Sequence, residues 1–378
     1  MKILYVAGAA PATVFSLAPL ANALRSAGHE VVMASVEAMM PFVAGAGIPA
    51  YSVTSLTVRD FISTDRDGNP VEFPKDDQEQ QLATGRWFAR LAAVSLEPLL
   101  KLAENWRPDL VVGGTLSYAA PLVARHLGVP WVRQAWDRDR PTVPDLGADE
   151  ELRPELDQLG LDRLPDPDLL IDITPPSLRP ADAPPAQLMR LMPANPQQRL
   201  EPWMYTRPGR RICVTSGSRV VRGQDDFLRT LAKNSLDLDA DLVVAAPEEV
   251  AAELRTEFPR VRAGWLPLDV VAPTCDLIAH HGGGVTGATA INAGVPQLII
   301  PQGSMFHDSS KRIADYGAAI TLMPDDATPA NFLDACRELM SNPSYGEKAR
   351  ELARETHGLP LPSHVVGVLE ELGGRTVA

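Results

Sequence analysis

The amino-acid sequence predicts an α/β protein with two Rossmann-like parallel-sheet domains facing a cleft. Three observations favour this fold class. The chain has 378 residues, enough for two domains of ordinary size. Short apolar runs alternate with helical patterns, which is typical of βαβ units and of a parallel sheet covered on both faces. The alternation stops in a proline-rich stretch, residues 141–208, and then restarts.

The first half supplies the elements of the first domain. Strands are expected over residues 3–7, 30–35, 50–53, 109–113 and 130–134, and helices over residues 14–27, 37–46, 83–106 and 117–127. Pro98 should kink or split the long third helix, because proline lacks the backbone donor that a helix interior needs. Residues 54–81 interrupt the alternation with a polar stretch, which is either a wall or lid over a binding site or a surface excursion.

The second half repeats this architecture after a linker. Residues 141–208 should end the first domain and form the linker, with a short helix near residues 151–160. Strands are then expected over residues 211–215, 241–246, 261–264, 276–280, 297–300 and 318–322, with helices between them and after Thr328. Ligands of such sheets bind at the carboxyl ends of the strands, so functional residues should follow strands directly.

Composition and charge exclude several function classes. Lys and Arg number 35 against 48 Asp and Glu, so the net charge is −13, which argues against non-specific nucleic-acid binding. No apolar stretch approaches the roughly 20 residues of a membrane span, and the short apolar N-terminus does not resemble a signal peptide. The three widely spaced cysteines suggest neither a disulfide framework nor a zinc site. We therefore expect a cytoplasmic protein.

The most informative segment is a glycine-rich turn between an expected strand and helix. Residues 280–286 read HHGGGVT. Glycines allow the backbone to approach a ligand closely, and the first N–H groups of a helix form a site for phosphate oxygens. His281 can add a donor and Thr286 a hydroxyl. The alternative is a tight connection that binds nothing.

Two other interpretations of this turn are weaker. Residues 282–287 fit the dinucleotide pattern G-x-G-x-x-G, but they lie deep in the second half rather than in the first turn of a domain. His280 and His281 are neighbours on one strand, so their side chains point to opposite faces and do not converge on a metal ion.

Three motifs of the second half carry a resemblance to a known family. They are WLPLD at residues 265–269, HHGG at 280–283 and GVPQL at 294–298. Together they resemble the nucleotide-binding signature of antibiotic glycosyltransferases, which are GT-B, nucleotide-sugar-dependent enzymes of family 1. Four further segments, residues 11–15, 84–90, 171–180 and 201–206, look similar to the urdamycin- and landomycin-type enzymes, which attach the first deoxysugar to angucycline aromatic polyketides.

The resemblance implies a division of labour. Residues 1–200 would bind the acceptor and residues 201–378 the nucleotide-sugar, with the last helix packing back on the first domain. Trp265 would stack on the nucleobase and the backbone of Leu266 would read its edge. The diphosphate would be held by His281, Gly283, Gly284, Val285 and Thr286, and faced by Ser216, Gly217, Ser218 and Arg219.

Two departures from the family pattern are informative. Many members carry a histidine base after the first strand, where this chain has Thr13, whose hydroxyl has no useful basicity near neutral pH. Asp137, just beyond an expected strand, is the candidate base; the alternative is a solvated loop aspartate. Where hexose-using members hold sugar hydroxyls with an acidic residue and a glutamine, this chain has Met305 and Phe306, which suit a sugar lacking hydroxyls.

The resulting hypothesis is an inverting transfer of a deoxysugar, such as D-olivose, from a dTDP-sugar to an aromatic polyketide, with C-glycosylation favoured over O-glycosylation. Thr13, Trp87 and Phe88 are the candidate acceptor residues, although Trp87 and Phe88 also fit an ordinary core. No metal or other cofactor is expected, and a homodimer is left open. The alternatives are a nucleotide-sugar epimerase of the same fold and a non-catalytic glycosyltransferase partner.

Overall fold

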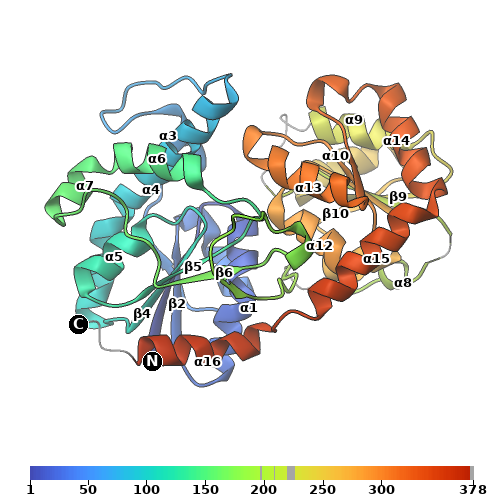
Figure 1. The fold of residues 1–378 in the computed structure, drawn as a ribbon. Helices are drawn as coiled ribbons and strands as arrows, with labels where there is room; N and C mark the ends of the chain where they lie inside the picture. Colours follow the sequence, from blue (N-terminus) through green and yellow to red (C-terminus); the bar gives the residue numbers. More distant parts are fainter. Residues whose placement is uncertain (196–197, 208, 219–225, 375–378) are drawn as a thin grey trace. The chain divides into compact units, whose positions relative to one another are not determined.

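The computed structural model describes residues 1–195, 198–207, 209–218 and 226–374 and divides the chain into two compact units (Figure 1). Unit 1 comprises Met1–Ile173, Asp182–Met192 and the segment from Pro360, and unit 2 comprises Thr174–Ala181 and Pro193–Leu359. The chain thus passes between the units near residues 173, 181, 192 and 359, where the sequence analysis placed one boundary at residue 200. The last helix is assigned to unit 1.

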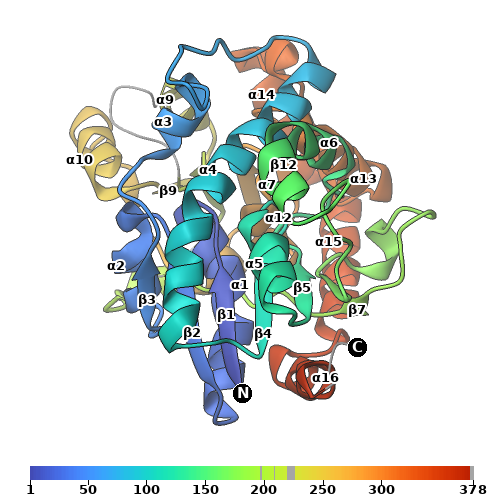
Figure 2. The ribbon, with the colours of Figure 1, turned by 90° about the vertical axis from the view of Figure 1, so that its left-hand side faces the viewer.

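Unit 1 is built on a seven-stranded parallel sheet with the order β3-β2-β1-β4-β5-β6-β7. The strands are β1 (Lys2–Val6), β2 (Glu30–Ser35), β3 (Ala50–Ser52), β4 (Leu110–Gly114), β5 (Trp131–Gln134), β6 (Leu169–Asp172) and β7 (Gln187–Leu188). β1 pairs with both β2 and β4, so the strand order reverses between β1 and β4. In Figure 2 the strands from β3 to β5 stand in this order, with α4 in front of them.

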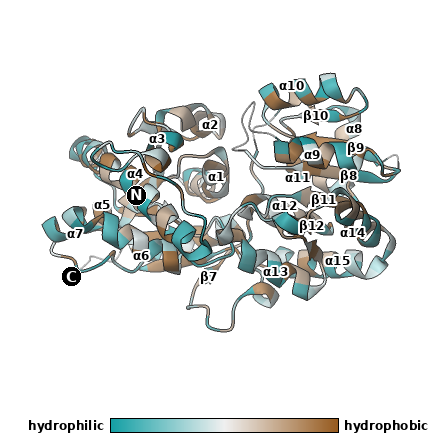
Figure 3. Ribbon diagram, turned by 90° about the horizontal axis from the view of Figure 1, so that it is seen from above, coloured by the Kyte–Doolittle hydropathy of each residue, from teal (hydrophilic) through white to brown (hydrophobic). Residues whose placement is uncertain are grey.

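The helices of unit 1 cover both faces of this sheet. They are α1 (Pro11–Ser26), α2 (Met40–Gly45), α3 (Val58–Ser63), α4 (Asp77–Asn105), α5 (Ala119–Leu127), α6 (Thr142–Glu151), α7 (Arg153–Gln158) and α16 (Pro362–Gly373), with the 3-10 turn η1 (Glu37–Met39). All five residues of β4 are buried, which explains its continuous apolar sequence. Helices in Figure 3 show both hydrophobic and hydrophilic residues along their length, as helices that cover a core do.

Unit 2 contains a six-stranded parallel sheet with the order β10-β9-β8-β11-β12-β13. The strands are β8 (Arg211–Thr215), β9 (Asp241–Ala245), β10 (Arg262–Gly264), β11 (Leu277–His280), β12 (Gln297–Ile299) and β13 (Ala319–Thr321). β8 pairs with both β9 and β11, so the order reverses between β8 and β11, as it does between β1 and β4 in unit 1. The two units therefore repeat one topology.

The helices of unit 2 are α8 (Pro202–Tyr205), α9 (Asp226–Ser235), α10 (Glu248–Glu257), α11 (Leu268–Val271), α12 (Gly284–Ala293), α13 (His307–Tyr316), α14 (Pro329–Ser341) and α15 (Pro343–His357), with the 3-10 turns η2 (Pro176–Leu178), η3 (Ala272–Thr274), η4 (Ser304–Phe306) and η5 (Pro324–Asp326). One face of the sheet packs its apolar residues against α9, α10 and α14. All three cysteines are buried and unbridged, and burial raises the pKa of Cys336 to about 12.

The structure differs from the predicted elements in several places, and α6 and α8 lie in the stretch expected to be a linker. The proline-rich stretch holds β6 and β7, which extend sheet 1 but are too short to give a periodic signal. Residues 54–81 contain α3. In addition, α4 begins earlier than predicted, at Asp77. The Asp76 carboxylate caps its first turn, because it accepts hydrogen bonds from the amides of Gln78 and Glu79, both at 3.0 Å. The helix continues through Pro98 without splitting.

Candidate active site

In unit 2 the predicted donor residues gather where the strand order reverses, between β8 and β11. At such a point the connections after the two adjacent strands run to opposite sides of the sheet, which leaves a crevice for a ligand. Residues 216–218 follow β8, and residues 281–283 follow β11. Because the two strands are parallel neighbours, both segments emerge at the same edge of the sheet.

His280 fixes the shape of this turn from behind. Its ring is fully buried, and its Nδ1 accepts a hydrogen bond from the Gly282 amide at 3.1 Å. Nε2 must therefore carry the proton, which it donates to Oε1 of Gln297 at 2.9 Å. The ring planes of His280 and His281 differ by 81°. His280 is thus a structural side chain and does not share a ligand with His281.

His281 occupies the space that two glycines leave open. A Cβ atom on Gly217 would lie 2.8 Å from Nε2 of His281, and a Cβ on Gly283 would lie 2.3 Å from the same atom. Any other residue at these positions would displace the imidazole. The ring of Phe306 lies edge-on to that of His281 at 6.1 Å. The tertiary structure therefore brings together four residues predicted to bind the donor.

The N-terminus of α12 continues this site. Gly283 caps the helix without a side-chain hydrogen bond, and the first intrahelical bond runs from the Gly287 amide to the Gly283 carbonyl at 3.0 Å. The amides of Val285 and Thr286 precede that bond and lie at the positive end of the helix dipole, as does the predicted Gly284. Backbone donors at this edge are the chemistry that a diphosphate requires.

The loop after β8 adds hydroxyl groups to the site. Thr215 shapes the turn, because its Oγ1 donates to the Ala245 carbonyl at 2.8 Å and accepts from the Gly217 amide at 3.1 Å. The Oγ atoms of Ser216 and Ser218 are buried and have no hydrogen-bond partner among the described residues. Arg219, predicted to face the phosphates, lies outside the residues that the structure describes.

The remaining predicted donor residues follow neighbouring strands. Trp265 comes directly after β10 and is partly exposed, and its carbonyl accepts from Nε2 of Gln198 at 2.9 Å. The side chain of Leu266 is buried in the core beside it. Met305 is partly exposed and lies with Phe306 in η4, after β12. All of them share the carboxyl edge of one parallel sheet.

In unit 1 the equivalent reversal point, between β1 and β4, is filled by an indole. A Cβ atom on Gly114 would lie 1.9 Å from the Trp136 ring, and one on Gly8 would lie 3.2 Å from it. The Trp136 amide donates to Oγ1 of Thr115 at 3.0 Å. The sequence analysis missed Trp136, although a tryptophan directly after a strand and before Asp137 was a usable signal.

Asp137 follows Trp136, beyond the carboxyl end of β5, and is partly exposed. Two other aspartates of this region hold α6 in place. Asp145 pairs with Arg133 at 2.8 Å, and Asp149 accepts from the Leu164 amide at 2.7 Å. Burial raises the pKa of Asp145, although the neighbouring Arg133 opposes that shift. Asp137 differs from Asp145 and Asp149 in its location, because it follows a strand whereas they lie in α6.

The predicted acceptor residues divide between two hollows. Phe88 contributes to a narrow apolar hollow at the ends of β1 and β2, which Gly8 and Ser117 also line. Trp87 lines a second hollow, on the side of α4 that residues 62–74 cover. The two rings stack at 3.6 Å, and Phe88 lies 6.2 Å from Trp136.

Thr13 lies beside Gly8, so the structure brings it close to Trp136. Its hydroxyl donates to the Ala10 carbonyl at 2.6 Å, near the start of α1. The hydroxyl therefore supports the turn between β1 and α1.

Within residues 1–195, 198–207, 209–218 and 226–374, no three His, Cys, Asp or Glu side chains are grouped so that they could hold a metal ion. In the same part of the chain, no helix has both the length and the apolar character needed to cross a membrane.

Comparison with known proteins identifies the family. The chain matches the N-terminal domain of the erythromycin biosynthesis protein CIII-like family over residues 22–217, and its C-terminal domain over residues 229–372. It is 32% identical to an L-demethylnoviosyl transferase of Streptomyces niveus, covering 93% of each chain. It is 29% identical to the aclacinomycin-T 2-deoxy-L-fucose transferase of Streptomyces galilaeus, covering 98% of this chain and 96% of that protein.

Solved structures give the same result. The glycosyltransferase SsfS6 of Streptomyces sp. SF2575, complexed with thymidine diphosphate, superposes with a TM-score of 0.87 at 35% identity, covering 98% of this chain and 99% of that one. The predicted fold class, two parallel-sheet domains as in GT-B enzymes, is confirmed, as is the resemblance to antibiotic glycosyltransferases. The chain is a glycosyltransferase and belongs to the erythromycin biosynthesis protein CIII-like family.

Proposed function

We propose that this glycosyltransferase transfers a 2,6-dideoxyhexose, D-olivose or a similar sugar, from a dTDP-sugar to an aromatic polyketide with inversion at the anomeric carbon. The observation that carries the donor half is the His281 ring, seated between Gly217 and Gly283 at the start of α12. The thymidine diphosphate bound to SsfS6 and the 2-deoxy sugar named for the aclacinomycin relative support this donor class.

The residues of unit 2 stabilise the leaving group in this proposal. The amides at the start of α12, together with His281 and the hydroxyls of Ser216 and Ser218, compensate the charge that develops on the departing diphosphate. Trp265 stacks on the thymine. These groups supply donors without a metal ion, so the prediction that no metal is needed stands as part of the proposal.

The residues of unit 1 activate the acceptor. Asp137 removes a proton from a phenol of the acceptor, which attacks the anomeric carbon as the diphosphate leaves. The phenolate also makes the neighbouring ring carbon nucleophilic, so one base starts both C- and O-glycosylation. In the C-glycosidic case the resulting cyclohexadienone then loses the proton of the attacked ring carbon and its oxygen is reprotonated, which restores the aromatic phenol. We favour the C-glycosidic product, on the likeness to the angucycline enzymes. Apolar rings around Gly8 suit a flat aromatic acceptor.

The proposed preference for a deoxysugar donor depends on the residues at the sugar-binding position, Met305 and Phe306. Met305 and Phe306 offer no hydrogen bonds from their side chains, so they suit a sugar without the corresponding hydroxyls. A hexose such as glucose would leave those hydroxyls without partners. We expect a dideoxy donor to be used better than UDP-glucose.

The test is a reaction of the purified chain with dTDP-D-olivose and a tetracyclic polyketide aglycone, with the product analysed by mass spectrometry and NMR. Transfer to a ring carbon or a phenol supports the proposal, and the NMR coupling at the anomeric position reports inversion. Better turnover with UDP-glucose in a competition assay would contradict the donor assignment. Isomerisation of the donor without acceptor would indicate an epimerase instead.

A further inference from the structure

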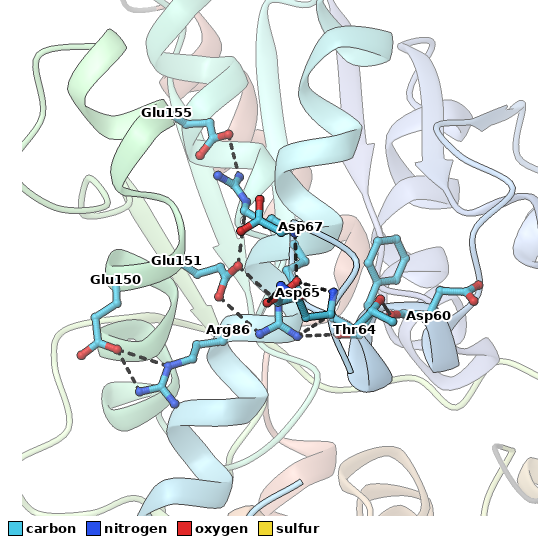
Figure 4. A network of polar contacts seen from close by, with 12 residues as sticks. Asp60, Thr64, Asp65, Asp67, Arg86, Glu150, Glu151 and Glu155 are labelled. Atoms are coloured by element: carbon cyan, nitrogen blue, oxygen red, sulfur yellow. Dashed lines mark hydrogen bonds and ion pairs between the residues drawn. The ribbon is translucent and has the colours of Figure 1, made fainter. Parts of the chain in front are cut away.

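Residues 57–74 of unit 1, here called the strap, cross over α4 as α3 and a following turn. Thr57 opens α3 with a capping box, and Thr64 and Pro70 form an antiparallel bridge. Asp65 stabilises the turn, because its Oδ1 accepts from the amides of Asp67 at 2.9 Å and Asn69 at 2.8 Å. The strap is therefore an ordered structure in its own right (Figure 4).

Arg90 of α4 binds the backbone of the strap. The side chain is nearly buried, and its Nη1 donates to the carbonyls of Phe61 at 3.0 Å and Thr64 at 2.8 Å. Its Nε also donates to Glu151 Oε1 at 3.2 Å. One guanidinium thus joins α4, the strap and the end of α6.

Arg66, in the turn of the strap, makes the outer attachment. Its Nη2 lies 2.6 Å from Glu155 Oε1 on α7, and its Nε lies 3.8 Å from Glu151 Oε1. The side chain of Arg66 is 29% exposed, against 10% for Arg90. Glu151 is therefore shared by both arginines, and the contacts around it are drawn in Figure 4.

The strap forms one wall of the second hollow, whose opposite wall is α4. Ile62, Val71 and Phe73 lie on the strap side, and Ala83 and Trp87 on the helix side. Phe73 is 47% exposed. Any movement of the strap changes the width of this hollow.

The hollow adjoins the aromatic side chains near the proposed base. Trp87 stacks on Phe88 at 3.6 Å, and Phe88 lies 6.2 Å from Trp136, the residue before Asp137. The three rings are buried and pack one against the next, from the hollow under the strap to the residue before Asp137. The strap therefore borders the Trp87 end of this run of rings, and Trp136 precedes Asp137 at the other end.

We propose that Arg66 and Arg90, acting through the shared Glu151, are positioning residues for acceptor binding. They hold the strap at the width that the acceptor requires, and they touch neither the reacting atoms nor the nucleotide. The inference rests on the proposed function for the identity of the acceptor, an uncharged polycyclic aromatic. The attachment itself does not depend on that identity.

The test removes the outer attachment with Arg66→Met, which keeps the apolar stem of the side chain. Amide hydrogen exchange, measured without substrate, should become faster in residues 57–74. The acceptor KM should rise about three- to fivefold, the effect expected of one partly buried ion pair, while the donor KM and kcat stay unchanged. Arg66→Lys should restore part of the acceptor KM, and high salt should raise the wild-type KM.

Arg163→Met is the matched control. Arg163 and Asp166 are also 2.6 Å apart, but they lie three residues apart on one exposed segment. This variant should change neither exchange in the strap nor the acceptor KM. Unchanged exchange in Arg66→Met, or faster exchange with an unchanged acceptor KM, would overturn the inference. A wild-type chain that neither binds nor glycosylates aromatic polyketides would instead refute the proposed function, while the exchange measurement would still report on the strap.

Discussion

The reversal points of the two sheets use glycine in the same way but admit different rings. In unit 2, Gly217 and Gly283 leave room for the imidazole of His281, beside the backbone donors of α12. In unit 1, Gly8 and Gly114 leave room for the indole of Trp136, beside apolar side chains. One topology thus provides a polar, donor-rich edge in one unit and an apolar edge in the other.

The strongest test of this division replaces the proposed base on the apolar side. Asp137→Asn should lower kcat by about 10²- to 10⁴-fold, because general-base catalysis contributes on that scale. Affinity for dTDP, measured by calorimetry, should not change, because the proposed nucleotide-binding residues lie in unit 2. Near-normal turnover by a folded variant would sink the assignment of Asp137.

The polar edge is tested by Gly283→Ala. A Cβ atom 2.3 Å from His281 Nε2 must displace the imidazole. Since misplacing a catalytic group by about 1 Å can cost about 100-fold, we expect kcat/KM for the donor to fall by about that factor. Gly367→Ala, in α16, is the control, because nothing lies within 4 Å of a Cβ there. Equal activity of the two variants would show that His281 does not act on the donor.

The apolar edge is tested by the milder change Gly8→Ala. The added Cβ would lie 3.1 Å from Thr13 Cγ2 and 3.2 Å from Trp136, so either neighbour must shift slightly. We expect the acceptor KM to rise about three- to tenfold, consistent with overpacking that costs about 1 kcal/mol. The Kd for dTDP should stay constant. An effect on the nucleotide instead would break the comparison between the units.

The hydrogen bond between His280 and Gln297, which supports the glycine turn of unit 2, is tested by Gln297→Leu. This change removes the acceptor of the buried His280 Nε2–H. A buried donor without a partner costs about 1–3 kcal/mol, so the free energy of unfolding of unit 2 should fall by that amount. Chemical denaturation followed by circular dichroism, compared with the wild-type chain, would measure it. An unchanged midpoint would mean that another group replaces Gln297.

The smallest effect is expected from metal removal. In the proposed site, backbone amides and His281 supply the donors for the diphosphate, so dialysis against EDTA should change kcat/KM by less than about twofold. Restoration of lost activity by Mg²⁺ would contradict this and would place a metal among the donor-binding groups.

The strand-and-helix alternation of the sequence predicted the parallel sheets, because continuous apolar strands have no other common use. It missed β6 and β7, which are short, and the start of α4, whose first turn is polar. It placed the predicted donor residues at one edge, because parallel strands end together. It grouped Trp87 and Phe88 as one acceptor set, but they line different hollows, as the difference of about 100° between adjacent helical residues requires.

Local chemistry in the sequence therefore determined the two sheets, the glycine turn and the family. Each of these depends on residues close together along the chain. The tertiary structure alone decided which ring fills each glycine gap, that His280 supports the turn through Gln297, and that Arg66 and Arg90 converge on Glu151. These contacts join residues from separate elements, and only the folded chain brings such residues within hydrogen-bond distance.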